Sequence, residues 1–187
     1  HLLRALTPIA KLTTGKQAVA IASEAIECCG GAGYIEDTGL PRLMADAQVL
    51  PIWEGTTNVL SLDTLRALAK GGSLEALTTD ATAHARTVQL PELAPAVAQA
   101  LAAIERATRW ASATAGNSDA LEAGARRFAM TLGRSLELVY LAAHAQWCRD
   151  HGDAAASYAI AATRRFARHG VDLLSDDDRD DRAALIG

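Results

Sequence analysis

Aromatic residues, cysteine and long apolar runs are all scarce in this sequence. Only 4% of its 187 residues are aromatic although 50% are hydrophobic, and alanine supplies much of the difference. β-Strands favour aromatic and β-branched side chains, whereas alanine favours helices that pack closely together. We therefore expect an all-α fold, and the length suffices for one or two domains with a hydrophobic core.

The chain has three cysteines, and two of them are adjacent as Cys28-Cys29. Such a set forms neither a disulfide framework nor a CxxC metal pair, so a reducing cytoplasmic environment is expected. The histidines do not have the spacing of metal ligands, so no metal site is expected. Cys28 and Cys29 are expected to act as small hydrophobic residues at the buried end of a helix.

No run approaches the roughly eighteen apolar residues that suggest a membrane span. The formal net charge of −4 gives no general argument for a nucleic-acid partner. The sequence begins at His1 rather than at methionine, and its first residues already have a helical pattern. We interpret the chain as a fragment of a longer polypeptide.

Apolar residues recur at helical spacing along most of the chain. A helix whose buried face includes Ala18, Val19, Ala22, Ala25, Ile26 and Cys29 is expected to end at Gly30-Gly31, where glycine can adopt the left-handed conformation. An extended connection is expected over 49–52, because the residue before Pro51 disfavours the helical region. Further helices are expected at about 41–47, after Thr56 or Thr57, and at about 74–88, 93–115, 118–149 and 153–169.

Two tryptophans and the end of the chain carry separate expectations. Trp110 and Trp147 are expected to anchor the core or an interface between the later helices. The segment 175–182 has five aspartates and two arginines, which predicts a solvated acidic tail. Together, the elements predict an antiparallel helical bundle with a helical extension packed against it.

Glu54 is the residue with the clearest potential for chemistry. Ile52 and Trp53 precede it, and Gly55 follows it and leaves room for a ligand. A carboxylate in an apolar pocket has a raised pKa, which makes it a better base near neutral pH. The alternative is a glutamate that interacts favourably with the dipole of the next helix. On the residues alone, this alternative is favoured.

The glycine-rich turn Gly30-Gly31-Ala32-Gly33 also has two interpretations. It follows a helix rather than a strand, so it is not a dinucleotide-binding fingerprint. Its backbone could allow a phosphate or another chain to approach closely. A helix C-cap followed by a tight turn is the simpler interpretation, and it is favoured on the residues alone.

Together, these two segments resemble acyl-CoA dehydrogenases from Gly30 to Leu60 without a gap. The shared features are the Gly-Gly-x-Gly-Tyr turn, the Arg42-Leu43-Met44 and Asp46-Ala47 helix, and the aromatic-Glu-Gly-Thr motif at 53–56. The resemblance extends over roughly the first 70 residues. It implies a C-terminal four-helix-bundle domain of that family over 1–72, followed by a helical extension over 73–187 with the acidic tail from about 175.

The resemblance also implies a chemistry for these residues. Glu54 would be the base that removes the α-proton of an acyl-CoA thioester while a hydride passes from the β-carbon to FAD. Thr56 and Asn58 would contact FAD, whereas Gly30 and Gly31 would approach the cofactor of a neighbouring subunit. The resemblance also implies a homo-oligomer, either a dimer or a tetramer. An electron-accepting flavoprotein is a possible further partner. The isolated 187 residues are expected to be inactive, because the family's other domains hold most of the FAD.

Four positions depart from the common pattern of the family. Glu27 and Asn58 replace glutamines, Ala45 replaces an arginine, and Trp53 replaces a tyrosine. Glu27 thus lacks the amide that in the family helps to hold the adenine half of FAD. With the long helical extension, these features resemble the alkylation-response (AidB-like) branch of the family, in which DNA binding is associated with the C-terminal helices.

DNA binding would require clustered cations on one face. The candidates form two groups of arginines: Arg126, Arg127 and Arg134, and then Arg164, Arg165 and Arg168. The chain is acidic and no lysine follows Lys70, so we expect these arginines to pair with acidic side chains or to cover apolar surface. The alternative to an enzyme is a helical oligomerisation or DNA-binding module with a vestigial active site.

Overall fold

The computed structural model describes residues 1–174, and within this range it contains helices and no strand. The all-α prediction is therefore confirmed, whereas the predicted acidic tail lies outside the described residues. No helix in this range is both long enough and apolar enough to span a membrane. The α-helices are α1 (Leu2–Cys28), α2 (Leu40–Val49), α3 (Thr57–Ala69), α4 (Ser73–Thr87), α5 (Ala94–Thr114), α6 (Ser118–Asp150) and α7 (Ala156–Arg168), with short 3-10 helices at Gly30–Gly33, Glu36–Thr38 and Pro91–Leu93.

Local sequence signals account for most helix ends. Gly30, Gly72 and Gly170 all have a positive φ, of 56°, 84° and 69°, and each lies where a helix was expected to end or begin. The Asn117 side chain accepts a hydrogen bond of 3.1 Å from the backbone N–H of Ala120 and caps α6. Only α7 begins clearly later than expected, at Ala156 rather than near residue 153.

The predicted extended connection at 49–52 is wrong. Val49 is the last residue of α2, and Leu50 has helical dihedral angles of φ −57° and ψ −45°. The N–H groups of Ile52 and Trp53 both donate 3.0 Å hydrogen bonds to the Val49 carbonyl. These bonds satisfy backbone groups at the end of α2, and they outweigh the preference for extended backbone before a proline.

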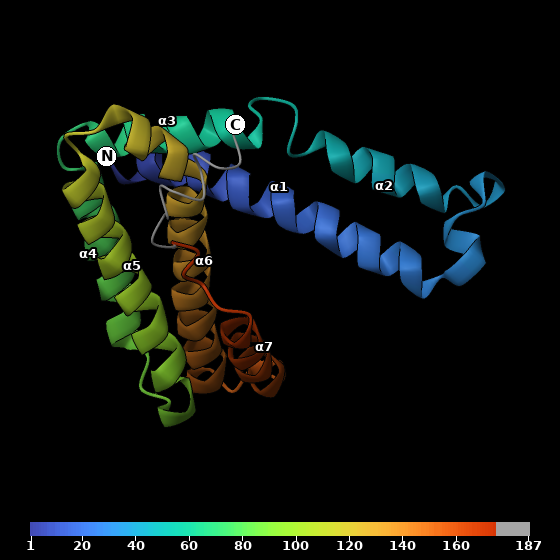
Figure 1. The fold of residues 1–187 in the computed structure, drawn as a ribbon. Coiled ribbons are helices and arrows are strands. Elements are labelled where there is room, and N and C mark those ends of the chain that lie inside the picture. Colours follow the sequence, from blue (N-terminus) through green and yellow to red (C-terminus); the bar gives the residue numbers. More distant parts are fainter. Residues whose placement is uncertain (175–187) are drawn as a thin grey trace.

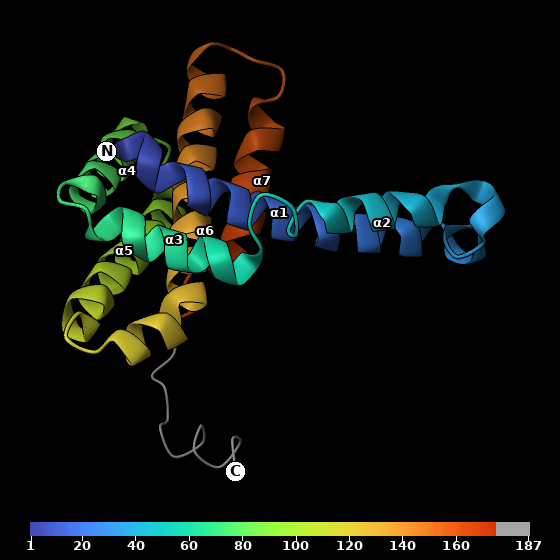
Figure 2. The ribbon, with the colours of Figure 1, turned by 90° about the horizontal axis from the view of Figure 1, so that it is seen from above.

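The molecule consists of a compact body and a projecting two-helix arm. The C-terminal part of α1 and the antiparallel α2 extend away from the other helices, as two views at right angles show (Figures 1 and 2). In the body, α6 packs against α5, α7, α3, α4 and α1. The 33-residue α6 is therefore the central element on which the remaining helices assemble.

The main core unites the beginning of the chain with its later helices. Its buried members are Leu174 and residues from four helices: Ala5 and Ile9 of α1, Leu77 and Ala81 of α4, Ile104 and Ala107 of α5, and Phe128, Leu132 and Leu136 of α6. Trp110 packs against Phe128 with ring centroids 5.4 Å apart, which confirms its prediction as a core anchor. The helices after residue 72 thus share one apolar core with α1, while a domain boundary at 72 stays a proposal.

The predicted buried face of α1 is wrong for the arm. Ala25, Cys28 and Cys29 are exposed, and Ala18, Val19, Ala22 and Ile26 are only partly buried. The reason is that α2 and the 3-10 helix at Gly30–Gly33 pack along this part of α1, whereas a cavity of about 830 Å³ lies between it and the helices α6 and α7. Trp147 is likewise 51% exposed on α6, where it stacks on the His151 ring rather than anchoring a core.

Candidate functional site

Glu54 lies in the turn between α2 and α3, where the arm returns to the body. Its φ of 54° is the only positive φ of a non-glycine residue within residues 1–174. Gly55 follows with a φ of 118°, and a Cβ at this position would approach Leu60 Cδ2 to 3.1 Å. A non-glycine residue in this region is strained, and such strain is concentrated at functional sites.

The surroundings of Glu54 are more open than the sequence suggests. Glu54 itself is exposed, as are Ile52 at 60% and Trp53 at 54%. Within the described residues, the apolar enclosure expected around the carboxylate is not formed. Any dry environment for Glu54 would have to come from polypeptide or ligand beyond residues 1–174.

Thr56 and Asn58 lie beside Glu54 at the start of α3. Thr56 is the N-cap residue with an extended backbone, as predicted, but its side chain makes no capping hydrogen bond. Both residues are exposed, and neither side chain forms a hydrogen bond with another residue of the described range. Their polar groups are thus available to a ligand, which fits the cofactor-contacting role implied by the resemblance.

Gly30 and Gly31 lie at the tip of the arm, away from the Glu54 turn (Figure 1). Lys11, which contacts that turn, and Cys29, which precedes Gly30, are separated by about 27 Å along α1 at 1.5 Å per residue. A Cβ on either glycine would meet no atom within 4 Å, so their backbone is open to approach. The structure therefore brings Glu54, Thr56 and Asn58 together and leaves both glycines apart from them.

Lys11 is the contact to this turn that the sequence analysis missed. Its Nζ donates hydrogen bonds of 2.6 Å to the Trp53 carbonyl and 2.8 Å to the Gly55 carbonyl. One turn later on α1, Gly15 lies next to the chain at Leu50 and Pro51, whose backbone atoms would be in van der Waals contact, at 3.4–3.5 Å, with a Cβ built there. No short-range sequence signal reveals a contact between residues 42 positions apart.

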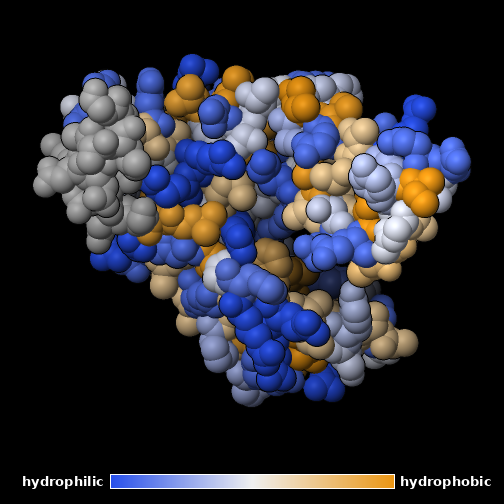
Figure 3. Space-filling view, turned by 45° about the vertical axis from the view of Figure 1, so that its right-hand side comes forward, coloured by the Kyte–Doolittle hydropathy of each residue, from blue (hydrophilic) through white to orange (hydrophobic). Residues whose placement is uncertain are grey.

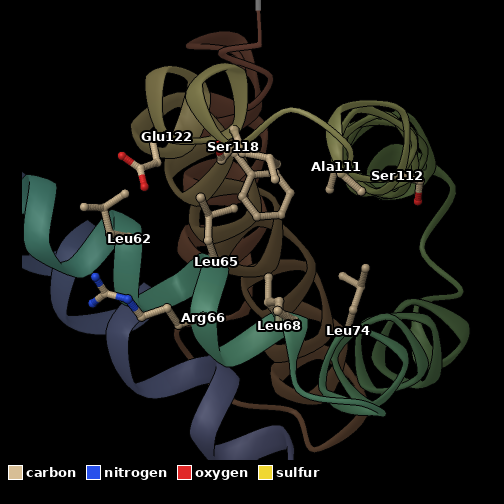
Figure 4. Close-up of a pocket in the computed structure, with 13 residues that line it drawn as sticks. Leu62, Leu65, Arg66, Leu68, Leu74, Ala111, Ser112, Ser118 and Glu122 are labelled. Atoms are coloured by element: carbon tan, nitrogen blue, oxygen red, sulfur yellow. The ribbon is translucent and has the colours of Figure 1, made fainter.

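Two cavities in the described residues lie away from Glu54. One, of about 430 Å³, lies between α3, α4, α5 and α6. In Figure 4, leucine side chains of α3 point into it, and Arg66 and Glu122 lie at one side. The other, of about 830 Å³, lies between α1, α6 and α7, where the surface is hollowed below the arm (Figure 3). The candidate site is defined by its motif and backbone geometry rather than by a closed pocket.

The titratable groups with clearly shifted pKa values are in the body. Burial raises the pKa of Glu137, while a 2.7 Å hydrogen bond from Gln17 and the charge of Arg134 oppose this shift. Burial also raises the pKa of Tyr140, whose hydroxyl donates a 2.6 Å hydrogen bond to Asp80. Within residues 1–174, no three His, Cys, Asp or Glu side chains are grouped so as to hold a metal ion.

Residues 1–69 match the family described as "Acyl-CoA dehydrogenase, C-terminal domain". The matched segment contains both the glycine turn and the Glu54 turn, and the match confirms the resemblance found in the sequence. This all-helical segment is therefore similar to a C-terminal domain of the acyl-CoA dehydrogenase type.

Two curated relatives each match less than half of the chain. Acyl-CoA dehydrogenase family member 11 of Caenorhabditis elegans is 71% identical over 65 residues, covering 35% of this chain and 10% of the relative. The putative acyl-CoA dehydrogenase AidB of Escherichia coli (strain K12) is 41% identical over 78 residues, covering 42% of this chain and 14% of the relative. The chain therefore matches only about a tenth of the length of the first relative.

The structural match extends over nearly the whole chain. A crystal structure of C. elegans ACDH-11 in complex with C11-CoA matches with a TM-score of 0.83 at 32% identity, and the match covers 99% of this chain and 32% of that one. A structure described as the apo-form of Bd2924 matches with a TM-score of 0.61 at 38% identity over 76% of this chain and 25% of its own. The fold beyond residue 69 is thus also found in a relative of this family.

Proposed function

We propose that this chain is the C-terminal part of an FAD-dependent acyl-CoA dehydrogenase, with Glu54 as the catalytic base. The observation that carries the proposal is the backbone of Glu54: a non-glycine residue at φ 54°, held between two helices inside the family's matching segment. Acyl-CoA dehydrogenase family member 11 of C. elegans, which is 71% identical over 65 residues, supports the assignment to a dehydrogenase. The C11-CoA in the complex of ACDH-11 supports an acyl-CoA as the substrate class.

In the proposed reaction, Glu54 and FAD each accept one of the two hydrogens that leave the acyl-CoA. Glu54 would take the α-proton of the acyl-CoA, a weakly acidic proton next to a thioester. When bound, FAD would supply the acceptor for the hydride that leaves the β-carbon. Thr56 and Asn58 would hold FAD through side chains that are exposed and without partners in the described residues.

Gly30 and Gly31 are proposed to approach the FAD of a neighbouring subunit. Their separation from the Glu54 turn along α1 supports this role, because one chain would then contribute to two cofactor sites. The proposal therefore includes a homo-oligomer. The isolated 187 residues are expected to have no turnover and to bind FAD weakly or not at all.

The decisive experiment uses the full-length protein reconstituted with FAD and mixed anaerobically with a series of acyl-CoAs. Loss of flavin absorbance should occur with at least one of them. Glu54→Gln keeps the size of the side chain but removes the proton acceptor, so the rate of flavin reduction should fall by about 10²–10⁴-fold or more. Glu75→Gln, at an exposed position of α4, is the matched control and should reduce at the unchanged rate. Full reduction rates in Glu54→Gln would remove this residue from the mechanism.

The second candidate is a helical oligomerisation or DNA-binding module with a vestigial flavin site. It is favoured by Arg164, Arg165 and Arg168, which are exposed on α7 and form no ion pair within residues 1–174. Triple substitution of these arginines by alanine should flatten the salt dependence of DNA retention by up to about three units of log–log slope if they bind phosphates. Unaltered retention, together with flavin that is reduced by an acyl-CoA, would favour the enzyme.

A further inference from the structure

The Glu54 turn is not held in place by hydrogen bonds of its own. Within the described residues, the last backbone hydrogen bond before Glu54 is donated by the Trp53 N–H, and the first one after it is accepted by the Thr56 carbonyl. Glu54 and Gly55, with φ of 54° and 118°, lie between these two hydrogen bonds, and neither forms a backbone–backbone hydrogen bond within residues 1–174. A strained backbone of this kind persists only where the surrounding structure fixes it.

The fixing contact comes from Lys11 of α1. Its ammonium group donates to the carbonyl on each side of Glu54, at 2.6 Å to Trp53 and 2.8 Å to Gly55. Hydrogen bonds from a charged donor are shorter and stronger than those between neutral groups. An ammonium has three donors and no fixed plane, so one ammonium can bind two carbonyls at once.

The same helix also lies against the beginning of the turn. Gly15 follows Lys11 by one helical turn, and a Cβ at this position would meet backbone atoms of Leu50 and Pro51 at 3.4–3.5 Å, an ordinary van der Waals contact. Lys11 and Gly15 thus contact the turn at its end and at its beginning. The carboxylate of Glu54 forms no ion pair with Lys11 within the described residues, so the ammonium binds the backbone and leaves the carboxylate exposed.

We propose that Lys11 is a positioning residue for Glu54. By binding the carbonyls of Trp53 and Gly55, it holds the turn in the one backbone conformation that presents the carboxylate at the start of α3. Its consequence for catalysis rests on the proposed function of Glu54, whereas its effect on the turn does not. Because a displacement of about 1 Å can cost 10²-fold in rate, the loss of this support should reduce proton abstraction more than substrate binding.

The test compares variants of the full-length, FAD-reconstituted protein. Lys11→Met keeps the aliphatic stem and removes the ammonium, and Lys11→Gln is too short to bind both carbonyls. Lys11→Arg keeps a charged donor and should restore much of the function. Lys16→Met, on the same helix and without a contact to the turn, is the matched control. Thermal unfolding of every variant separates local from global effects.

The first readout is hydrogen exchange of the peptide covering 50–56, measured by mass spectrometry. Exchange of this segment should be about tenfold faster or more in Lys11→Met and Lys11→Gln than in Lys16→Met, because two charge-assisted hydrogen bonds are lost. Equal exchange in all three variants would overturn the proposal. This readout does not depend on any activity of Glu54.

The second readout is anaerobic flavin reduction by an acyl-CoA. In Lys11→Met the limiting rate should fall by about a hundredfold, while the half-saturating acyl-CoA concentration should stay within about threefold of its original value. An unchanged limiting rate alongside an inactive Glu54→Gln would overturn the positioning role and leave the proposed function intact. A fully active Glu54→Gln would instead overturn the proposed function, and hydrogen exchange would still decide what Lys11 does to the turn.

Discussion

Gly133 of α6 lies directly against Thr13 of α1 where the two helices cross. A Cβ at Gly133 would overlap the Thr13 hydroxyl oxygen and would lie 3.2 Å from Ile9 Cγ2. Thr13 is itself buried, and its hydroxyl donates a 2.8 Å hydrogen bond to the Ile9 carbonyl. The missing side chain at position 133 therefore sets how closely the arm-bearing helix approaches the central helix of the body.

Replacing Gly133 by alanine should destabilise the chain even though alanine is the better helix former. The gain in helix propensity is about 1 kcal/mol, whereas overpacking at a close helix contact costs about 1–3 kcal/mol or more. We expect a net loss in the free energy of unfolding, measured by urea denaturation. The combination Thr13→Ala with Gly133→Ala should recover part of this loss, because the overlapping oxygen is then removed.

Gly116→Ala provides the control for this comparison. Gly116 lies between α5 and α6, and a Cβ there would meet no atom within 4 Å. Its substitution should change the free energy of unfolding by less than about 0.5 kcal/mol. If Gly133→Ala proved as mild as Gly116→Ala, the close contact with Thr13 would not limit the crossing of α1 and α6.

The sequence predicted what is encoded locally and missed what depends on distant partners. The end of α1 followed from Gly30, whose chemistry acts within a few residues, and the expected bounds of α5 and α6 differ from the observed ones by at most one residue. The contact of Lys11 with the Glu54 turn joins segments 42 positions apart. No residue close to either segment in the sequence indicates this contact. One face of the helix that ends at Gly30 was predicted to be buried, because apolar spacing shows which side of a helix needs a partner, but it does not show where that partner comes from.

The Gln146 side chain supports the connection between α4 and α5. Its Oε1 accepts hydrogen bonds of 2.8 Å from the N–H of Gln89 and 2.9 Å from the N–H of Leu90. Gln146 is only 7% exposed, so water cannot readily replace it. Gln146→Leu should lower the free energy of unfolding by about 1–3 kcal/mol or more, because two backbone donors lose their acceptor.

Gln89→Ala is the matched control for Gln146, because it removes an exposed side chain and keeps the backbone N–H that Gln146 binds. Its free energy of unfolding should stay within about 0.5 kcal/mol of the original value. Both variants can be compared by urea denaturation. Equal stabilities for Gln146→Leu and Gln89→Ala would mean that the two hydrogen bonds contribute nothing measurable.

Glu137 makes the stability of the chain depend on pH. Burial raises its pKa above the ordinary value of 4.5, so the folded chain binds this proton more tightly than the unfolded chain does. The stabilisation that results is complete below about pH 4.5, and it is lost as the pH rises through the raised pKa. Relative to Glu137→Gln, the original chain should therefore gain stability as the pH falls from 7 towards 4.5.

The difference between the two unfolding free energies, measured in urea at a series of pH values, isolates this group from the other carboxylates. Glu105→Gln, at an exposed position of α5, controls for the general effect of removing a carboxylate. A difference between the original chain and Glu137→Gln that stays constant from pH 7 to 4.5 would show that burial does not shift this pKa.

The arm exposes apolar side chains on both of its helices. Ile21 of α1 is 68% exposed and Leu43 of α2 is 57% exposed, and Figure 3 shows hydrophobic residues at the surface of this side of the molecule. Contiguous exposed apolar surface is unfavourable in a monomer and marks an interaction site. We therefore expect the 187-residue chain to self-associate at micromolar concentration, with a dimer as the first species.

The double variant Ile21→Glu with Leu43→Glu should shift this equilibrium towards the monomer, because carboxylates would be buried without partners in any contact formed through the arm. Tyr158→Glu is the matched control, since Tyr158 is 78% exposed but lies on α7 in the body. Sedimentation velocity at several concentrations distinguishes the two variants. If Tyr158→Glu dissociated the chain while the arm variant still associated, the contact would lie on the body. A monomeric original chain at micromolar concentration would contradict self-association altogether.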